Sequence, residues 1–487
     1  MSILSSLSVT WSLVVLVVTL LFIYGVWPYG FFKKLGVPGP RPWPFFGTFL
    51  SYRKGFYKFD TECYKKYGKI WGIYDGRLPI LMVLDIEMIK SIMVKDCYSV
   101  FTNRRLAGPF ADAVSVVKDE KWKRIRGSLS PFFTSGRLKE IFPIADTYGD
   151  RFIENLKKRN PEDGIKIKDV LAPYSMDVVA SASFSVEIDS INNLNDPLVA
   201  HIKKMFNFSF FSPILLIITL FPFTASLLGK LGITLFSKSS MDFFYSSLRK
   251  IKDQHSTSNN KRVDFLEQPV KANTVQTECL TDHEILSQSS IFVLAGYETT
   301  STTLTFLLYN LATNPDLQSK LVEEIDEAFP CNAPVTYDVL MKLGYIDMVI
   351  SESMRLLPTA PRLERVCKKT IELNGITIPK GTLVAIPTYV LYRDPQLWES
   401  PEEFRPERFS SENDINQYTF MPFGLGPRNC VGMRFALMIM KVVVVKLLQN
   451  FSIETCRETQ IPIQLNSFFQ PTVPVTLKFV PRSHKKE

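Results

Sequence analysis

The sequence lacks paired cysteines and has little histidine. Its 487 residues contain seven cysteines, an odd and scattered set, and four histidines. None of the cysteines lies in a Cys-x-x-Cys pair, so a zinc or iron–sulfur site would lack ligands. This cysteine usage fits a reducing compartment. A metal held mainly by protein side chains is therefore a poor interpretation, and any catalytic cysteine must act alone.

Linkers and repeats are also missing. Between residues 50 and 480 there is no Ser/Gly-rich linker, low-complexity block or internal repeat. A chain of this length could hold more than one domain, but without a boundary we expect one large catalytic domain over residues 46–487. The 37 phenylalanines suggest an enclosed apolar cavity in addition to a core.

The N-terminal segment has no charge over residues 9–26 and is almost wholly apolar. About 18 such residues are near the minimum that spans a bilayer. No basic residue precedes the run, whereas Lys33, Lys34 and Arg41 follow it, which places the C-terminal side in the cytoplasm. We expect residues 1–30 to be an uncleaved transmembrane signal anchor. A cleaved signal peptide is the alternative, but the basic start and small-residue cleavage site are not evident.

Residues 31–45 are basic and rich in proline, with the run Pro38-Gly39-Pro40-Arg41-Pro42-Trp43-Pro44. Dense proline cannot be helical and gives a stiff, extended spacer. This segment is expected to be a hinge between the anchor and the catalytic domain.

Two segments predict β-hairpins: residues 70–84 around Asp75-Gly76, and residues 371–378 around Asn374-Gly375. The centre, from about 137 to 355, has a mainly helical pattern. The predicted fold is therefore mostly α with small antiparallel β-sheets, preceded by a single N-terminal transmembrane helix.

One long helix is expected from Thr281 to Asn314. Thr281 and Glu284 form a capping box, and Pro315 marks the end. Its length predicts that it crosses the core. Its middle, residues 295–303, is small and rich in hydroxyls, which invite side-chain bonds to the carbonyl four residues earlier. A kink is expected there.

Residues 421–433, Met-Pro-Phe-Gly-Leu-Gly-Pro-Arg-Asn-Cys-Val-Gly-Met, place Cys430 in a glycine-rich loop before an apolar helical pattern. Gly424 and Gly426 permit backbone angles that let the loop lie flat against a ligand. The amides at the helix start and the cation of Arg428 favour thiolate over thiol. A lone thiolate of this kind suits one axial position on a haem iron.

Three motifs carry a family resemblance. Phe423-x-x-Gly426-x-Arg428-x-Cys430-x-Gly432 resembles the haem-binding signature of the cytochromes P-450. Ala295-Gly296-x-Glu298-Thr299 resembles the family's oxygen-binding helix, and Glu352-x-x-Arg355 its E-x-x-R motif. The match extends from residue 35 to about 480 and is most similar to vertebrate family 3, subfamily A. It implies the cytochrome P-450 fold and haem b with Cys430 as the thiolate ligand.

The resemblance assigns roles on the helix that carries Thr299. The Thr299 hydroxyl would hold a water and deliver protons, and the Glu298 carboxylate would connect it to solvent. Gly296 would leave room over the haem.

Further residues are implied for the haem and the substrate. Indole N–H and guanidinium groups would bind the two haem propionates. The residues implied are Arg104, Trp122, Arg126, Arg365 and Arg428. Arg105 is an alternative to Arg104. Glu352, Arg355 and Arg408 would form a clamp behind the cysteine loop. A surface salt bridge is the plainer interpretation of that motif. Residues expected at the substrate are Ser115, Leu294, Ala295, Thr359, Ala360 and Phe468.

Two departures from plain patterns affect the pocket. Ala107 stands where the branch usually has phenylalanine, which changes the expected pocket shape.

The phenylalanine-rich segment 201–248 contains an apolar run too short to span a bilayer. We expect a membrane-dipping flap that collects lipophilic substrates; the alternative is ordinary core.

The implied function is an NADPH-dependent haem-thiolate monooxygenase of the endoplasmic reticulum membrane, single-pass, with its catalytic domain in the cytoplasm. It would insert one oxygen atom into lipophilic substrates such as steroids, drugs and other xenobiotics. The electrons would come from NADPH–cytochrome P-450 reductase, with cytochrome b5 as a second candidate partner.

The chain has a net charge of +9 but contains no nucleic-acid-binding motif. Five basic residues lie close together in the sequence: Lys118, Lys121, Lys123, Arg124 and Arg126. We interpret this basic cluster as a docking face for a protein partner, and the alternative is a solvated helix face.

Two rival functions were weighed. A haem-thiolate isomerase of the thromboxane-synthase type rearranges peroxides without a reductase, and such enzymes lack the helix threonine that Thr299 supplies here. A non-catalytic haem-binding protein would need neither Glu298-Thr299 nor a basic face. Thr299 therefore favours the monooxygenase.

Replacing Cys430 tests the proposed axial ligand. Because Cys430 is the only cysteine in a loop shaped for haem, Cys430→Ser or Cys430→His should abolish the reduced carbon monoxide band from which the family takes its name. The measurement is a reduced carbon monoxide difference spectrum. Survival of the band in either variant would show that another group is the ligand.

Overall fold

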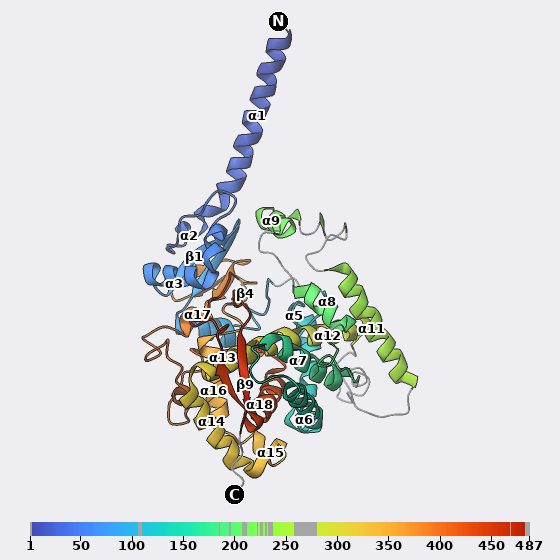
Figure 1. Ribbon diagram of the computed structural model, residues 1–487. Coiled ribbons are helices and arrows are strands. Elements are labelled where there is room, and N and C mark those ends of the chain that lie inside the picture. Colours follow the sequence, from blue (N-terminus) through green and yellow to red (C-terminus); the bar gives the residue numbers. More distant parts are fainter. Residues whose placement is uncertain are drawn as a thin grey trace.

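A computed structural model describes residues 2–482 except 106–109, 185, 194–195, 207–211, 222, 225–226, 229–230, 232–236, 258–279 and 468. Ala107 and the predicted substrate residue Phe468 therefore lie outside the described residues. The anchor helix α1 (Ser2–Val26) stands apart from the folded body (Figure 1), and its large apolar residues from Val9 to Ile23 are exposed. The most apolar 18-residue window within residues 9–34 has mean hydropathy 2.4 and 6% of that window is buried, so the segment is long and apolar enough to cross a membrane. A second helix, residues 282–313, passes the same test, but 67% of its window is buried and it belongs to the core.

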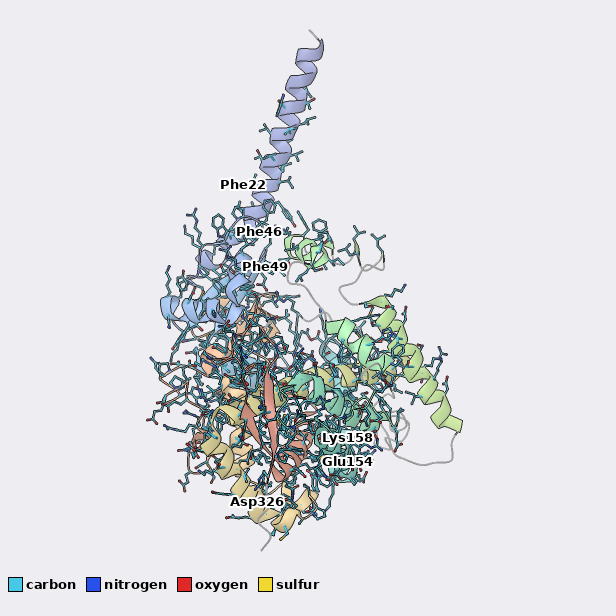
Figure 2. All side chains as sticks on the ribbon, in the orientation of Figure 1. Phe22, Phe46, Phe49, Glu154, Lys158 and Asp326 are labelled. Carbon is cyan, nitrogen blue, oxygen red and sulfur yellow. The ribbon has the colours of Figure 1, made fainter. Side chains whose placement is uncertain are left out.

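The proline-rich hinge is packed against the body rather than spaced from it. It begins with a short helix, α2 (Phe31–Lys34), and Phe32 and Val37 are buried. The amide of Gly72 donates to the carbonyl of Pro38 at 2.8 Å. Figure 2 shows Phe22 just outside the body and Phe46 and Phe49 at the junction. The anchor therefore enters a docked segment, because the hinge bonds to the edge of a sheet.

The sheets are small. The first has the order β1–β2–β7–β4, with bounds β1 Ile70–Asp75, β2 Leu78–Val83, β7 Leu383–Ile386 and β4 Leu363–Val366. Its β2–β7 pair is parallel and the other two pairs are antiparallel. The second is antiparallel: β3 Ile165–Lys166, β9 Thr476–Pro481 and β8 Phe451–Thr455. The third is the hairpin of β5 (Ile371–Leu373) and β6 (Ile376–Ile378).

Both predicted hairpin turns are confirmed. Asn374 and Gly375 have φ of 50° and 74°, and Gly76 has φ of 57°. Asn and Gly tolerate these angles better than other residues, which is why the turns lie where the sequence placed them.

The rest of the body is mainly helical, as expected. The helices after α2 are α3 Phe56–Tyr67, α4 Ile86–Lys90, α5 Asp119–Leu129, α6 Ser135–Lys157, α7 Ile167–Phe184, α8 Pro197–Phe206, α9 Pro213–Leu220, α11 Lys238–Thr257, α12 Asp282–Ala295, α13 Ser301–Thr313, α14 Pro315–Ala328, α15 Tyr337–Leu340, α16 Tyr345–Leu356, α17 Thr388–Leu391 and α18 Met433–Asn450. Shorter helical segments are η1 Trp27–Gly30, η2 Phe49–Lys54, η3 Ser91–Lys95, η4 Ser130–Phe133, η6 Gly296–Thr300, η7 Pro330–Asn332, η8 Pro406–Phe409 and η9 Gly426–Arg428.

The long central helix is present as α12, η6 and α13. Thr281 and Glu284 form the predicted capping box. The predicted hydroxyl bonds also occur: Thr299 donates to Ala295 O at 2.6 Å, and Thr305 donates to Ser301 O at 2.7 Å. Between α12 and α13 the backbone becomes π-helical. Such bulges are common at functional sites, and this one lies where the sequence is richest in hydroxyls.

The apolar run of α9 is at the surface. None of its residues is buried, so for α9 the core interpretation is wrong. Phe221, which follows α9, stacks on Tyr24 at the foot of the anchor, with ring centroids 5.7 Å apart. Figure 1 accordingly shows α9 beside the lower end of α1. The flanking helices α8 and α11 do supply core residues, including Ile202 and Phe244.

Gly296 serves packing between helices. A Cβ placed there would lie 2.5 Å from Cγ2 of Val179 on α7. The expectation that Gly296 leaves room over a haem is therefore wrong, because a side chain at this position would point toward α7. Helix α7 can approach η6 closely because Gly296 has no side chain.

We predict that Gly296→Ala destabilises the protein. Alanine gains about 1 kcal/mol in a free helix, but overpacking costs about 1–3 kcal/mol, so we expect a lower melting temperature. Adding Val179→Ala should restore part of the loss, because the two sites touch. Gly127→Ala is the matched control, since a Cβ on Gly127 of α5 meets nothing within 4 Å. A Gly296→Ala protein as stable as the Gly127→Ala protein would contradict the packing role.

Candidate functional site

One cavity gathers most of the predicted site residues. Its volume is about 390 Å³ and its wall is mainly apolar. The predicted residues in its lining are Arg104, Ser115, Trp122, Arg126, Ala295, Thr299, Thr359, Ala360, Arg365, Arg428 and Cys430. Of the predicted catalytic and substrate residues that the structure describes, Glu298 and Leu294 are not in the lining. Leu294 packs in the apolar core instead, so its contact with substrate stays a prediction.

The cysteine loop is shaped by two glycines. Gly424 and Gly426 have φ of 73° and 69°, which favours glycine. At Gly426 a Cβ would lie 2.0 Å from the carbonyl oxygen of Met93, so the loop is pressed against η3. The amide of Cys430 donates to Phe423 O at 2.8 Å, closing the loop. Cys430 is thereby exposed to the cavity.

Opposing effects act on the Cys430 thiol. Burial raises the pKa of the Cys430 thiol above its ordinary value, while the Gly432 amide and the guanidinium groups of Arg126 and Arg104 act to lower that pKa. These last three groups are the local donors and cations that favour a thiolate. Coordination to a haem iron would favour the thiolate further, since metal coordination deprotonates a thiol.

Arg428 holds the loop by its hydrogen bonds. Its Nε donates to Thr102 O at 2.7 Å, Nη1 to Val114 O at 2.9 Å and Nη2 to Val117 O at 2.7 Å. The guanidinium also lies over the Trp122 ring at 4.5 Å. Arg428 thus lines the cavity, but each of its nitrogens already binds a backbone carbonyl. Its expected role as a propionate ligand is weakened for that reason.

Arg104, and not Arg105, belongs to the cavity. Arg104 donates through Nη2 to Arg428 O at 2.7 Å. Arg105 instead pairs with Asp75 and Glu364, both at 2.8 Å. The two neighbouring residues bond to different partners, and of the two only Arg104 is in the cavity lining, which favours Arg104 as the predicted propionate ligand.

Arg365 is a buried cation with unused donors. It is 2% exposed, and its Nε and Nη2 are buried without a hydrogen-bond partner among the described residues, although the Cys97 thiol lies nearby. Desolvation, followed by the nearby charge of Arg104, lowers the pKa of Arg365 to about 9. Burial likewise lowers the pKa of Arg126. Buried unpaired charge is costly, so this cluster fits an anion in the cavity.

The residues present fit haem b. Arg104, Trp122, Arg126 and Arg365 line the cavity together with Cys430, so they would supply donors for two propionates, and Cys430 would supply the sulfur ligand. Arg126 meanwhile bonds Asn429, through Nη1 to the carbonyl at 2.9 Å and through Nη2 to Oδ1 at 2.8 Å. The propionate side and the cysteine side are therefore linked through Asn429.

Thr299 and Glu298 face different surroundings. Thr299 lines the cavity. The carboxylate of Glu298 pairs with Lys168 of α7 and accepts from Thr302 Oγ1 at 3.4 Å. Lys168 also contacts Gln470 at 3.4 Å. Sequence reasoning missed Lys168, because it belongs to no motif and meets Glu298 only through the packing of α7.

The structure brings the clamp residues together. Arg355 donates to Glu352 through Nε at 2.7 Å and Nη2 at 2.8 Å, and Arg408 Nε donates to Glu352 at 3.0 Å. Both Glu352 and Arg355 are 0% exposed, so the surface-bridge alternative is wrong. Arg355 also donates to Tyr392 O at 2.7 Å, and the Tyr392 hydroxyl accepts from the amide of Met421 at 2.9 Å. These contacts connect the clamp to the start of the cysteine loop.

The basic cluster on α5 is mostly engaged. Lys121 pairs with Asp112 at 2.6 Å, and Arg124 pairs with Glu284 of α12. Arg126 turns toward the cavity. Among the described residues Lys118 and Lys123 have no ion pair, and both are exposed. The predicted docking face is thus smaller than expected, because two of its cations hold α5 against α12.

Comparisons with known proteins agree with this site. The family model for Cytochrome P450 matches residues 37–479. The chain is similar to Cytochrome P450 3A40 of Oryzias latipes, 54% identical over 97% of both chains. It is also similar to Cytochrome P450 3A27 of Oncorhynchus mykiss, 52% identical over 97% of this chain and 95% of the relative. Cytochrome P450 3A2 of Rattus norvegicus is 53% identical over 99% of both chains.

A cysteine in a glycine-bounded loop, a donor cluster for an anionic cofactor and a threonine-bearing helix thus share one cavity. The match covers nearly the whole folded body. The chain belongs to the cytochrome P450 family, and it is a haem-thiolate monooxygenase that binds haem b through a cysteine thiolate.

Proposed function

We propose that this monooxygenase oxidises steroids, drugs and other lipophilic xenobiotics with electrons from NADPH–cytochrome P-450 reductase. The single observation that carries the proposal is the placement of Cys430 and Thr299 in the lining of one mainly apolar cavity. The haem, when bound, supplies oxygen activation and transfer of one oxygen atom to the substrate. The protein binds and orients both molecules and manages protons.

Substrate binding is assigned to the apolar wall together with a few polar groups. Ser115 lines the cavity, and its hydroxyl is buried without a hydrogen-bond partner in the described part of the chain. Thr359 bonds Thr303, at 2.7 Å between the hydroxyl oxygens. A substrate carbonyl or hydroxyl would satisfy Ser115, because an unmade buried hydrogen bond is costly.

Proton delivery is assigned to Thr299 and Glu298. The Thr299 hydroxyl donates to Ala295 O, so its oxygen can accept a hydrogen bond from a water in the cavity. Glu298 lies behind this helix turn, on the side of Lys168. For Glu298 to pass a proton toward the cavity, its carboxylate must leave Lys168. The bonded pair therefore represents a resting arrangement of the relay.

Membrane attachment is assigned to residues 1–30, with residues 31–45 as the docked hinge and residues 46–487 as the catalytic domain. The basic residues after the anchor support a cytoplasmic position for that domain, and the membrane we propose is that of the endoplasmic reticulum. The exposed apolar groups of the α9 region lie beside the anchor's foot and include Ile217 and Phe223. They support the membrane-dipping flap. Cytochrome b5 is a second candidate donor of electrons.

Thr299→Ala tests proton delivery. Haem and substrate binding should persist, while NADPH electrons are diverted into peroxide and excess water. The share of NADPH recovered as product should fall several-fold. Thr305→Ala is the matched control: Thr305 makes the same kind of bond to the preceding turn but is absent from the cavity lining. Since Thr300 also lines the cavity, Thr299→Ala/Thr300→Ala is measured as well. Normal coupling in both variants would contradict the role.

Charge reversal tests the docking face. We predict that Lys118→Glu/Lys123→Glu slows the first electron transfer from the reductase and flattens its ionic-strength dependence, because exposed charges steer association. Turnover driven by an organic peroxide should be spared.

Lys121 is left unchanged in this experiment because it holds Asp112. The matched control is Lys157→Glu/Lys158→Glu, which makes the same charge change at the end of α6, away from α5 (Figure 2). Loss of peroxide-driven turnover together with electron transfer would indicate damage to the fold and contradict docking at Lys118 and Lys123.

A further inference from the structure

One peptide unit of the cavity wall is held from two sides. The amide of Val114 donates to Oε1 of Gln288 at 2.7 Å, and the carbonyl of Val114 accepts from Arg428 at 2.9 Å. Two residues earlier, the carbonyl of Asp112 accepts from Nε2 of Gln288 at 2.6 Å. The segment 112–115 is therefore fixed between the central helix and the cysteine loop.

Gln288 is well suited to this task. It is fully buried on α12, and its Nε2 also donates to Glu284 O at 3.2 Å. Its carbonyl oxygen and both amide hydrogens are thus used. Turning the amide over would set NH2 against the Val114 amide and oxygen against two carbonyls. Only one orientation of the side chain satisfies all its partners.

The fixed segment carries residues that face the substrate region. Val114 and Ser115 both line the cavity, whereas Gln288 does not. Gln288 therefore acts on the cavity only through the backbone of residues 112–114. At the outer end Asp112 is further held by Lys121 at 2.6 Å and by His283 at 2.7 Å.

We propose that Gln288 is a positioning residue that sets the site of oxidation on bulky substrates. It does so by fixing Val114 and the free hydroxyl of Ser115 over the cavity. The inference rests on the assignment of this cavity as the substrate site. Because the reaction is directed at whichever carbon lies nearest the bound haem, a shift of the wall changes which carbon is attacked.

A purely structural role for Gln288 predicts a different experimental result. If its amide only satisfies buried polar groups, replacing it lowers stability and leaves the distribution of products unchanged. A positioning role changes that distribution at equal haem content. The ratio of regioisomeric products is therefore the decisive measurement.

The experiment compares three variants of the full-length holoenzyme with testosterone, a probe that presents several oxidisable carbons. Gln288→Met keeps the approximate volume and loses every hydrogen bond. Gln288→Glu keeps the acceptor for the Val114 amide and loses the donor to Asp112. The matched control is Ser290→Ala, because Ser290 is buried on the same helix and, among the described residues, its side chain bonds only within that helix, to Leu286 O at 2.8 Å.

We expect Gln288→Met to change the ratio of hydroxylated products about threefold or more, the scale of one lost neutral hydrogen bond. Gln288→Glu should also change the ratio, because it sets a carboxyl oxygen against the Asp112 and Glu284 carbonyls, and Ser290→Ala should not change it. Should Gln288→Met fail to take up haem, Gln288→Glu carries the test alone. Product ratios equal to the parent's in the haem-loaded Gln288 variants would overturn the proposal.

A Ser115→Phe variant separates this failure from failure of the cavity assignment. If Ser115→Phe changes the product ratio while the Gln288 variants do not, the cavity is the substrate site and Gln288 is not its positioning residue. If Ser115→Phe also leaves the ratio unchanged, the cavity assignment itself fails, and the inference fails with it.

Discussion

The guanidinium of Arg428 is the interaction on which the site depends most. It lies two residues before Cys430 and binds the backbone of Thr102, Val114 and Val117. One buried side chain therefore ties the cysteine loop to the segment that forms the opposite part of the wall. Its own carbonyl accepts from Arg104, which adds the propionate cluster to the same network. The ligand, the wall and the anion site are thus positioned relative to one another by a single residue.

Two buried groups of charges show how scaffold and binding site differ. Around Glu352 each charge has partners, and breaking a buried pair of that kind costs about 3–5 kcal/mol. Around Arg365 the nearby guanidinium groups carry like charge, and two of its nitrogens have no hydrogen-bond partner among the described residues. The first group is complete in the protein itself. The second lacks a carboxylate, so it fits an anionic ligand.

Local chemistry explains which features were predictable from the sequence. The turns at Gly76 and Asn374-Gly375, the capping box of Thr281 and the glycines of the cysteine loop each depend on residues close in the chain. The direction of side chains was harder to predict. Gly296 faces α7, Glu298 faces Lys168, and Leu294 lies in the core, because all three depend on how α12 and η6 pack.

Charge and contact partners distant in the sequence were the hardest part. Lys121 and Arg124 looked like free surface cations, but they pair with Asp112 and Glu284. Gln288 had no signal at all, since a lone buried glutamine belongs to no motif. The family match confirms the fold class and the activity, yet these details required three-dimensional contacts.

The foot of the anchor has a consequence for how such a protein is handled. Tyr24 stacks on Phe221, and the Tyr29 hydroxyl accepts from the amide of Gly47 at 2.9 Å. Deleting residues 1–30 to obtain a water-soluble enzyme would remove both tyrosines along with the membrane segment. The α9 region would then lose the aromatic surface on which its end rests. A truncated enzyme would therefore lack one of the described contacts that hold the end of α9, and the position of α9 in it need not be that of the full chain.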